Sequence, residues 1–108
     1  MKNYQHFHEK IIELAKKHIL YTPHAIRQMN SEKRMITTND VEKVISGGRI
    51  IEDYPDDKRG HSCLMHAEIN ERHIHIVCAP KDNYVAIITA YVPDKEIWSN
   101  NFNTRIKK

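Results

Sequence analysis

The sequence predicts an α+β fold, in which N-terminal helices pack on one face of a four-stranded antiparallel sheet and a short helix follows near the C-terminus. Three observations predict it. Apolar residues recur at helical spacing in the first half of the chain, they alternate with polar residues in the second half, and the two patterns stay segregated. Such segregation favours an α+β fold over a parallel α/β sheet. The length of 108 residues is typical of one domain, so we expect residues 1–108 to form a single domain.

Helical periodicity and capping residues define the expected helices. Thr22 can cap a helix whose first turn suits Pro23, and Thr38, or Thr37, can cap another that the Gly47-Gly48 pair ends. We expect helices over residues 6–20, over residues 23–32, and from residue 38 to the glycine pair.

Short runs of β-branched and aromatic residues, separated by turn residues, predict the strands. Turn residues follow the first run at Pro55 and the last run at Pro93. We expect strands over residues 49–54, 61–69, 72–79 and 84–92, a short helix over residues 93–98, and a polar tail over residues 101–108.

The composition limits the classes of function. A net charge of +3 and a pI near 8.9 permit an anionic partner such as RNA without requiring one. The two cysteines are too few for a secreted disulfide scaffold or a four-cysteine zinc site. The first residues lack the apolar stretch of a signal peptide, and no apolar run approaches the roughly 20 residues of a membrane span. We therefore expect a cytoplasmic protein with reduced thiols and no membrane partner, of undetermined oligomeric state.

The Asn70-Glu71 pair predicts the register of a hairpin. A two-residue turn pairs Ile69 with Arg72, and every later pair follows from that one. One face of the hairpin is then apolar, and it brings Cys63 opposite Cys78 as two small thiol side chains. The other face carries Leu64, His66, Glu68, His73, His75 and Val77.

Three histidines and a carboxylate on one sheet face allow three interpretations. The face could be a polar surface in contact with water. Its imidazoles could transfer protons or bind phosphate. Alternatively, His66, His73 and His75 could bind a metal ion, because His73 and His75 form an H-x-H pair on one side of a strand. The residues alone leave all three open.

Several short motifs, taken in order, resemble one bacterial family. They are His24-Ala25-Ile26-Arg27-Gln28-Met29, Arg34-Met35-Ile36-Thr37, Asp40-Val41-Glu42, residues 48–57, His75-Ile76-Val77, residues 88–94, Trp98 and Arg105. Together they are similar to the domain of unknown function 4258 family over residues 24–105. His75 matches a histidine of that family, whereas His66 and His73 are additional in this chain.

The resemblance implies a fold like that of the RelE and barnase group of ribonucleases. It also implies a toxin of a bacterial toxin–antitoxin pair, with RNA as substrate and a zinc-finger antitoxin of the MqsA kind as partner. Toxins of this type cleave RNA without a metal, so no cofactor is expected. The 2′-hydroxyl of the RNA is then the nucleophile.

Such a reaction needs two proton transfers and stabilisation of charge on the phosphate. We expect His24 and His75 to transfer the protons. Arg27 lies three positions after His24, on the same helix face, and could hold the phosphate. Tyr91 is a further expected catalytic residue, and the expected substrate-binding residues are Arg34, Thr89 and Arg105.

Structural roles remain open for these residues: a helix-terminal hydrogen bond for His24, surface ion pairs for Arg27 and Arg34, and core packing for Tyr91. Two other functions also remain open. The chain could be a non-catalytic module that binds a protein or a nucleic acid through the sheet face, or a metal-binding protein that uses the three histidines of that face. An RNA-cleavage assay in EDTA and a zinc titration distinguish these functions.

Overall fold

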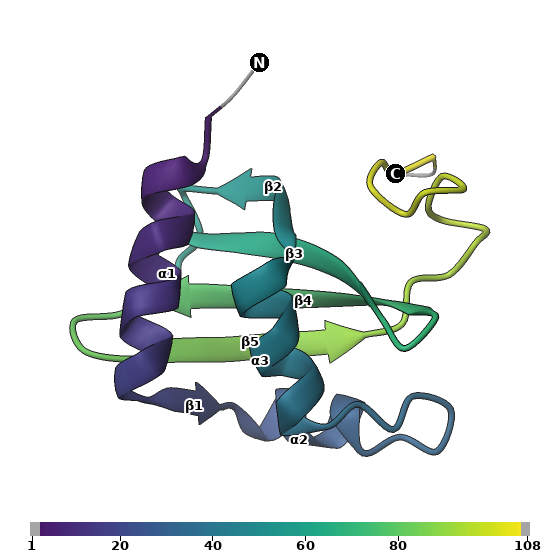
Figure 1. Cartoon of the computed structure of the whole chain (residues 1–108), viewed down its shortest axis with the longest axis horizontal. Coiled ribbons are helices and arrows are strands. Elements are labelled where there is room, and N and C mark those ends of the chain that lie inside the picture. The colour runs from purple at the N-terminus through teal and green to yellow at the C-terminus, as the bar shows by residue number, and fades with distance from the viewer. Residues whose placement is uncertain (1–2, 107–108) are drawn as a thin grey trace.

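The structure, a computed structural model, describes residues 3–106 (Figure 1). It contains three helices and five strands, which confirms the α+β class. In chain order they are α1 (Gln5–Lys17), β1 (Ile19–Tyr21), α2 (Pro23–Met29), α3 (Thr38–Gly47), β2 (Arg49–Tyr54), β3 (Ser62–Ile69), β4 (Arg72–Pro80) and β5 (Val85–Tyr91). Within residues 3–106, no helix has the length and hydropathy needed to cross a membrane.

The strands form one mixed sheet in the order β1-β5-β4-β3-β2. Strands β2 to β5 pair antiparallel with their neighbours, as expected, whereas β1 pairs parallel with β5. The expected four-stranded antiparallel sheet was therefore wrong in strand number and in one strand direction. The fifth strand comes from the part of the chain that was expected to complete the first helix.

That helix ends at Lys17 rather than at residue 20, because His18 has an extended backbone. The next three residues pair with Val85 and the two residues that follow it. Two hydrogen bonds hold this pairing, from Val85 N to His18 O at 3.0 Å and from Thr22 N to Ile87 O at 3.2 Å. A strand of three residues is too short to show an alternating pattern, so only the distant partner strand reveals it.

Side-chain caps set the starts of the next two helices. The hydroxyl of Thr22 accepts a hydrogen bond from Ala25 N at 3.1 Å, which begins α2 as expected. This helix ends at Met29, three residues before the predicted end. A capping box begins α3, in which Thr37 and Asp40 each bind the other's backbone N–H at 3.0 Å.

The hairpin register predicted from the sequence is confirmed along its whole length, from Ile69 opposite Arg72 to Cys63 opposite Cys78. Asn70 and Glu71 both have positive φ angles, 53° and 68°, as a two-residue hairpin turn requires. The two cysteines are buried free thiols with their sulfurs 4.0 Å apart.

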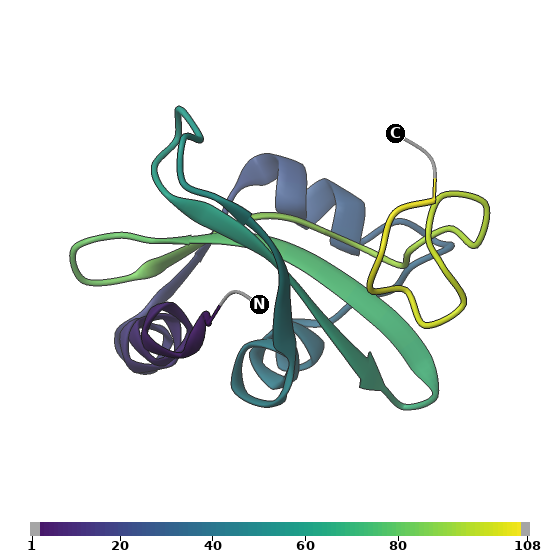
Figure 2. The same cartoon turned by 90° about the horizontal axis from the view of Figure 1, so that it is seen from above.

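Figure 2 shows α1 and α3 on one side of the sheet, where they cover its apolar face. Ile11 and Leu14 of α1 and Val41 and Val44 of α3 meet the sheet there. Helix α2 lies beside β5, toward the other side of the sheet, so the expectation that all the N-terminal helices share one face was wrong. The helices of the first half of the chain thus lie on both sides of the sheet instead of forming a single layer.

The C-terminal segment, residues 93–106, packs on the second sheet face, the one that carries Leu64, His66 and His75. Residues 93–98 do not form the expected helix: they contain a turn, after which Trp98 pairs with Arg105 as an isolated antiparallel bridge. Trp98 and Phe102 are buried against Leu64 in a second apolar cluster. The part of the second sheet face that carries the histidines is therefore largely covered by the C-terminal segment, and only some of it is open to solvent.

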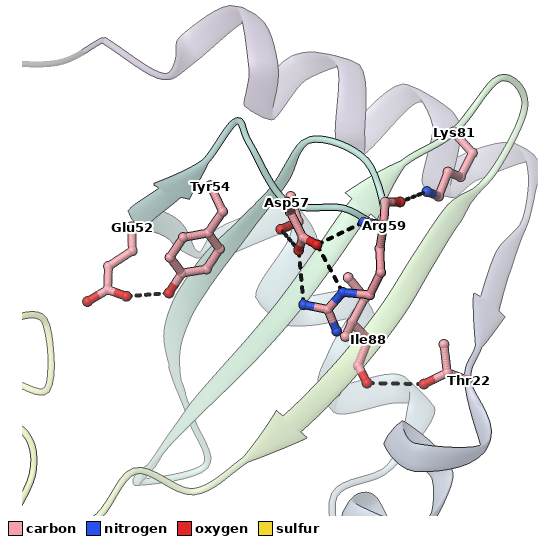
Figure 3. Close-up of polar contacts among 8 residues, drawn as sticks. Thr22, Glu52, Tyr54, Asp57, Arg59, Lys81 and Ile88 are labelled. Atoms are coloured by element: carbon pink, nitrogen blue, oxygen red, sulfur yellow. Dashed lines mark hydrogen bonds and ion pairs between the residues drawn. The ribbon is translucent and has the colours of Figure 1, made fainter. Parts of the chain in front are cut away.

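Polar contacts hold the β2–β3 connection (Figure 3). The Asp57 carboxylate accepts two hydrogen bonds from the Arg59 guanidinium, at 2.9 and 3.0 Å, and one from the Ser62 hydroxyl at 2.6 Å. Lys81, just after β4, donates to the backbone carbonyl of Arg59. These contacts hold the β2–β3 connection in place, and the Lys81 contact links it to the β4–β5 connection.

Gly48, where α3 meets β3, provides a test of this packing. A Cβ atom there would lie 2.5 Å from Val44 O and 2.6 Å from His66 O, whereas one at Gly47 would meet nothing within 4 Å. We expect Gly48→Ala to lower the free energy of unfolding by about 1–3 kcal/mol, because the helix end must move from the sheet. Gly47→Ala, the matched control, should be neutral or stabilising, since alanine favours helix. Urea denaturation measures both, and equal effects would contradict the close approach.

Candidate functional site

Three side chains on the second sheet face form a hydrogen-bonded series. His66 and His73 lie on the paired strands β3 and β4, and Asn103 lies in the C-terminal segment. His66 Nδ1 is 2.5 Å from Asn103 Oδ1, and His66 Nε2 is 2.8 Å from His73 Nδ1. An amide oxygen only accepts, so His66 Nδ1 donates to it, and the neutral His66 accepts from His73 through Nε2. This arrangement leaves Nε2 of a neutral His73 as an unprotonated nitrogen.

The neutral form of His66 is favoured by its surroundings. The side chain is 5% exposed, and its burial lowers its pKa below the usual value, with a smaller contribution in the same direction from His73. The hydrogen bond to Asn103 acts in the opposite direction but does not reverse the shift. At neutral pH, His66 can therefore accept a hydrogen bond from His73 and donate one to the Asn103 amide.

A cavity of about 660 Å³ opens beside this series. It lies between the end of α3, the start of β2, the β3–β4 hairpin and the C-terminal segment. Lys43 and Arg49 bring positive charge to it, and Glu68 brings one negative charge. Arg49 is the direct cross-strand neighbour of His66. The cavity is lined by Lys43, Ser46, Gly47, Gly48, Arg49, His66, Ala67, Glu68, Ile69, His73, Asn101 and Asn103.

His75, expected to transfer a proton, is fully buried. Its Nε2 donates to the carbonyl of Phe102 at 2.8 Å, and its Nδ1 lies 3.3 Å from the Tyr91 hydroxyl. Its ring also meets the Trp98 ring edge-on, with centroids 4.5 Å apart. Both nitrogens are thus engaged inside the protein, and this histidine holds the C-terminal segment against the sheet.

Acidic, basic and phenolic groups meet beside this buried histidine. Arg105 makes two hydrogen bonds to the Glu52 carboxylate, at 2.9 and 3.2 Å, and its guanidinium lies 4.7 Å from the centre of the Trp98 ring. The Tyr54 hydroxyl donates to the same carboxylate (Figure 3). Burial, followed by the hydrogen bond to Glu52, raises the pKa of Tyr54 to about 12, and burial raises that of Tyr91 to about 12. Both phenols are therefore protonated at neutral pH.

The structure brings only some of the expected site residues together. His75 contacts Tyr91, and Arg105 lies in the neighbouring polar group. His24 and Arg27 are exposed on α2, and no hydrogen bond or ring contact of the described residues links either one to His75. The remaining two expected site residues are half-buried. Arg34 lies in the connection before α3, and Thr89 lies on β5, opposite Val77 of β4.

The described residues, 3 to 106, include no group of three histidine, cysteine or acidic side chains that is arranged to hold a metal ion. His66 and His73 use facing nitrogens to bind each other, and both nitrogens of His75 have partners in the protein. Of the imidazoles that suggested a metal site, two are thus hydrogen-bonded to each other, and the third is bonded to other parts of the protein.

The predicted hairpin placed His66, Glu68 and His73 on one face, but the sequence did not predict that Lys43, Arg49 and Asn103 meet them at a cavity. The β2–β3 pairing that sets Arg49 beside His66 contains a bulge after Ile50, so no simple register predicts it. Lys43 reaches the cavity through the packing of α3 on the sheet. Asn103 reaches it because the C-terminal segment folds back, for which the sequence carries no periodic signal.

The burial of His75 predicts a pH dependence of stability. Burial lowers its pKa from 6.5 to about 4, so between these values the unfolded chain binds a proton that the folded chain does not. Stability should therefore fall as the pH decreases through this range, by about 2 kcal/mol between pH 7 and pH 5 for this residue alone. Urea denaturation of the wild type at both pH values measures the loss.

His75→Phe is the variant that isolates this contribution, because phenylalanine keeps a ring but cannot be protonated. It should lose stability at pH 7, since the Phe102 carbonyl and Tyr91 lose a partner. Its stability should, however, change less between pH 7 and pH 5 than that of the wild type. An equal pH dependence in the two proteins would show that this imidazole is not the group responsible.

Comparison with known proteins places the chain in a family. The profile of the family described as "Domain of unknown function (DUF4258)" matches residues 21–92, a segment that contains the cavity residues Lys43, Arg49, His66 and His73. No curated protein and no solved structure matches the chain significantly. Because the matched segment spans well over half of the 108 residues, the chain belongs to the domain of unknown function 4258 family.

Proposed function

We propose that this chain is a metal-independent endoribonuclease, acting as the toxin of a toxin–antitoxin pair, and that its reaction takes place in the cavity beside His66 and His73. The observation that carries the proposal is the hydrogen-bonded series from His73 through His66 to Asn103 on the wall of a cavity that two cations also line. A base oriented by a second group, beside positive charge, is what cleavage by the RNA 2′-hydroxyl requires.

His73 is the proposed general base. Its Nδ1–H is engaged by His66, so the ring is held in one tautomer and Nε2 is left to accept a proton. Phe102 supports this orientation, because its ring lies 4.5 Å from the imidazole, centre to centre. His66 and Asn103 act as positioning residues in this scheme.

The chemical step follows from these assignments. His73 Nε2 accepts the proton of the 2′-hydroxyl, the 2′-oxygen forms a bond to the adjacent phosphorus, and the bond from phosphorus to the 5′-oxygen breaks. Arg49 stabilises the charge on the phosphate oxygens, and the ammonium of Lys43 protonates the departing 5′-oxygen. The products are a 2′,3′-cyclic phosphate and a 5′-hydroxyl, and water then returns the proton from His73 to Lys43.

This assignment replaces the pair His24 and His75 that the sequence suggested. His75 has no exposed surface and its two nitrogens already have partners, so it is a poor candidate for meeting a substrate. His24 is exposed, but it does not line the cavity that contains the cations. Both residues remain in the test below, because direct comparison separates the two assignments.

The toxin role rests on the resemblance of the family to RelE-like ribonucleases, and the partner we propose is accordingly a zinc-finger antitoxin. The net charge of +3 is compatible with an RNA substrate. No cofactor takes part in this scheme, because every group that it uses belongs to the chain or to the RNA.

Cleavage of a labelled RNA in the presence of EDTA tests the proposal. We expect the wild type to release 2′,3′-cyclic phosphate ends and His73→Ala to reduce the rate about 10²–10⁴-fold, as for loss of a general base. His6→Ala is the control, because this histidine is fully exposed on α1 and far from the sheet histidines in sequence. Thermal unfolding of each variant verifies that it is folded.

Three results would contradict the assignment. RNA left intact by folded wild type would remove the ribonuclease proposal as a whole. Full activity in His73→Ala together with a loss in His24→Ala would return the chemistry to the pair suggested by the sequence. Activity that depends on added Zn²⁺, with stoichiometric uptake by calorimetry, would favour the metal-binding alternative.

Expression in a bacterial cell tests the toxin role separately. We expect induction of the wild type without a partner to arrest growth, because RNA cleavage removes messages, and we expect His73→Ala to relieve the arrest at an equal protein level. Growth curves with immunoblots measure both. Arrest by the wild type and by His73→Ala alike would show that toxicity, if present, does not come from this cavity.

A further inference from the structure

A second hollow, of about 390 Å³, lies where α2, β1 and the beginning of α3 meet. Most of its wall is apolar, and two wall residues are unusually exposed for large apolar side chains, Ile26 at 46% and Met35 at 65%. Neighbouring exposed apolar side chains around a hollow are typical of an interaction surface. We call this hollow the α2–α3 groove and define it by Tyr21, Ile26, Met29, Met35, Ile36 and Thr38.

Met35 is held outward by an unusual backbone. Its φ angle is 45°, in the left-handed region that residues other than glycine rarely adopt. The guanidinium of Arg72 fixes it there, donating to Met35 O at 2.9 Å, to Arg34 O, and to the Asp40 carboxylate at 3.1 Å. Strained backbone that its surroundings hold in place is concentrated at functional sites, and here it presents an apolar side chain to solvent.

Tyr21, which lines the groove, carries a buried donor that has no hydrogen-bond partner among residues 3–106. The hydroxyl of Tyr21 is buried and is the one buried side-chain polar atom that lacks a hydrogen-bond partner within residues 3–106. Burial, followed by the charge of Glu42, raises the pKa of this phenol, so it is protonated and can donate. A shift of the Tyr21 side chain toward the groove would let this hydroxyl donate to an acceptor on a bound partner, which would remove the penalty of an unsatisfied buried group.

The charges of the rim indicate which partner would fit. Three cations, Arg27, Lys33 and Arg34, lie in the segment that carries the two exposed apolar residues, against one acid, Glu32. On α3, the Asp40 carboxylate is already paired with Arg72, and Glu42 adds one negative charge near Tyr21. The N-terminal end of α3, which also lines the groove, adds partial positive charge. Apolar walls within a positive rim complement a segment that carries both apolar and acidic side chains.

From these observations we propose that the α2–α3 groove binds an acidic amphipathic segment of a partner protein. Apolar side chains of the segment fill the space between Ile26 and Met35, and acidic side chains face the nearby cations. The Tyr21 side chain shifts so that its hydroxyl donates to an acceptor of the segment. Because Arg72 already fixes the groove, little ordering is needed on binding. The proposal does not depend on ribonuclease activity, since the groove shares no residue with the cavity beside His66 and His73.

Selection from a phage-displayed library of random peptides of about 12 residues tests this groove. We expect the enriched peptides to carry apolar residues three or four positions apart, with Asp or Glu between them. The most enriched peptide, labelled with fluorescein, should bind at least about tenfold more weakly to Ile26→Asp and to Met35→Asp than to the wild type. Both residues are exposed, so the variants should fold, and thermal unfolding verifies this.

Ile97→Asp is the matched control, because Ile97 is also an exposed isoleucine, 38% accessible, but lies outside the groove. It should change the peptide affinity by less than about twofold. Selection of basic peptides, absence of any enriched sequence, or equal binding to all the variants would overturn the proposal. Sedimentation showing a dimer that Met35→Asp dissociates would also overturn it, by identifying a second copy of the chain as the occupant.

Discussion

The two-residue turn at Asn70-Glu71 is the constraint on which the rest of this molecule depends. Because both turn residues have left-handed backbones, β3 and β4 pair without a bulge from the turn to Cys63 opposite Cys78. A slip of one residue would send every side chain of one strand to the opposite face. The apolar core under α1 and α3, and the imidazoles on the other side, could not then exist together.

The same turn places two consecutive residues of β4 in two different sites. Arg72 extends to the connection before α3 and fixes Met35 at the groove, whereas His73 faces the other side and binds His66 at the cavity. Alternation along one strand is sufficient to separate them. The groove and the cavity therefore both depend on one hairpin but have no lining residue in common. A partner bound in the groove would leave the cavity open.

Local signals in the sequence predicted most of the fold, and distant packing decided the remainder. The capping residue Thr22 and the Asn70-Glu71 turn act over four residues or fewer, and each led to the correct element boundary or register. Of the two caps considered for α3, Thr38 and Thr37, the structure has Thr37. The three residues of β1 had helical neighbours and no period of their own, and only pairing with β5 makes them a strand. The expected helix at residues 93–98 failed for a similar reason, because burial of Trp98 against Leu64 determines how that segment runs.

The candidate site shows the same division. Register alone brought His66 and His73 together from the sequence. Of the three interpretations left open for that face, a surface fully in contact with water does not fit, since the C-terminal segment packs on it and the Phe102 carbonyl accepts a hydrogen bond from His75 Nε2. His75, which matches a family motif, is thus buried with partners at both ring nitrogens, whereas His73, outside the motif, borders the cavity.

The family match includes most, but not all, of the residues that form the candidate site. Lys43, Arg49, His66 and His73 all lie within the matched residues 21–92, whereas Asn103, which sets the tautomer of His66, lies beyond them. Without an acceptor at Nδ1, His66 could place its proton on Nε2, and it would then donate to His73 Nδ1 instead of accepting from it. His73 would be left with its proton on Nε2, which has no hydrogen-bond partner among residues 3–106, and could no longer act as a base there. One amide in the C-terminal segment therefore determines which end of the imidazole pair is unprotonated, His73 Nε2 at the cavity or His66 Nδ1 inside the protein, and the covering segment is part of the candidate site as well as of the fold.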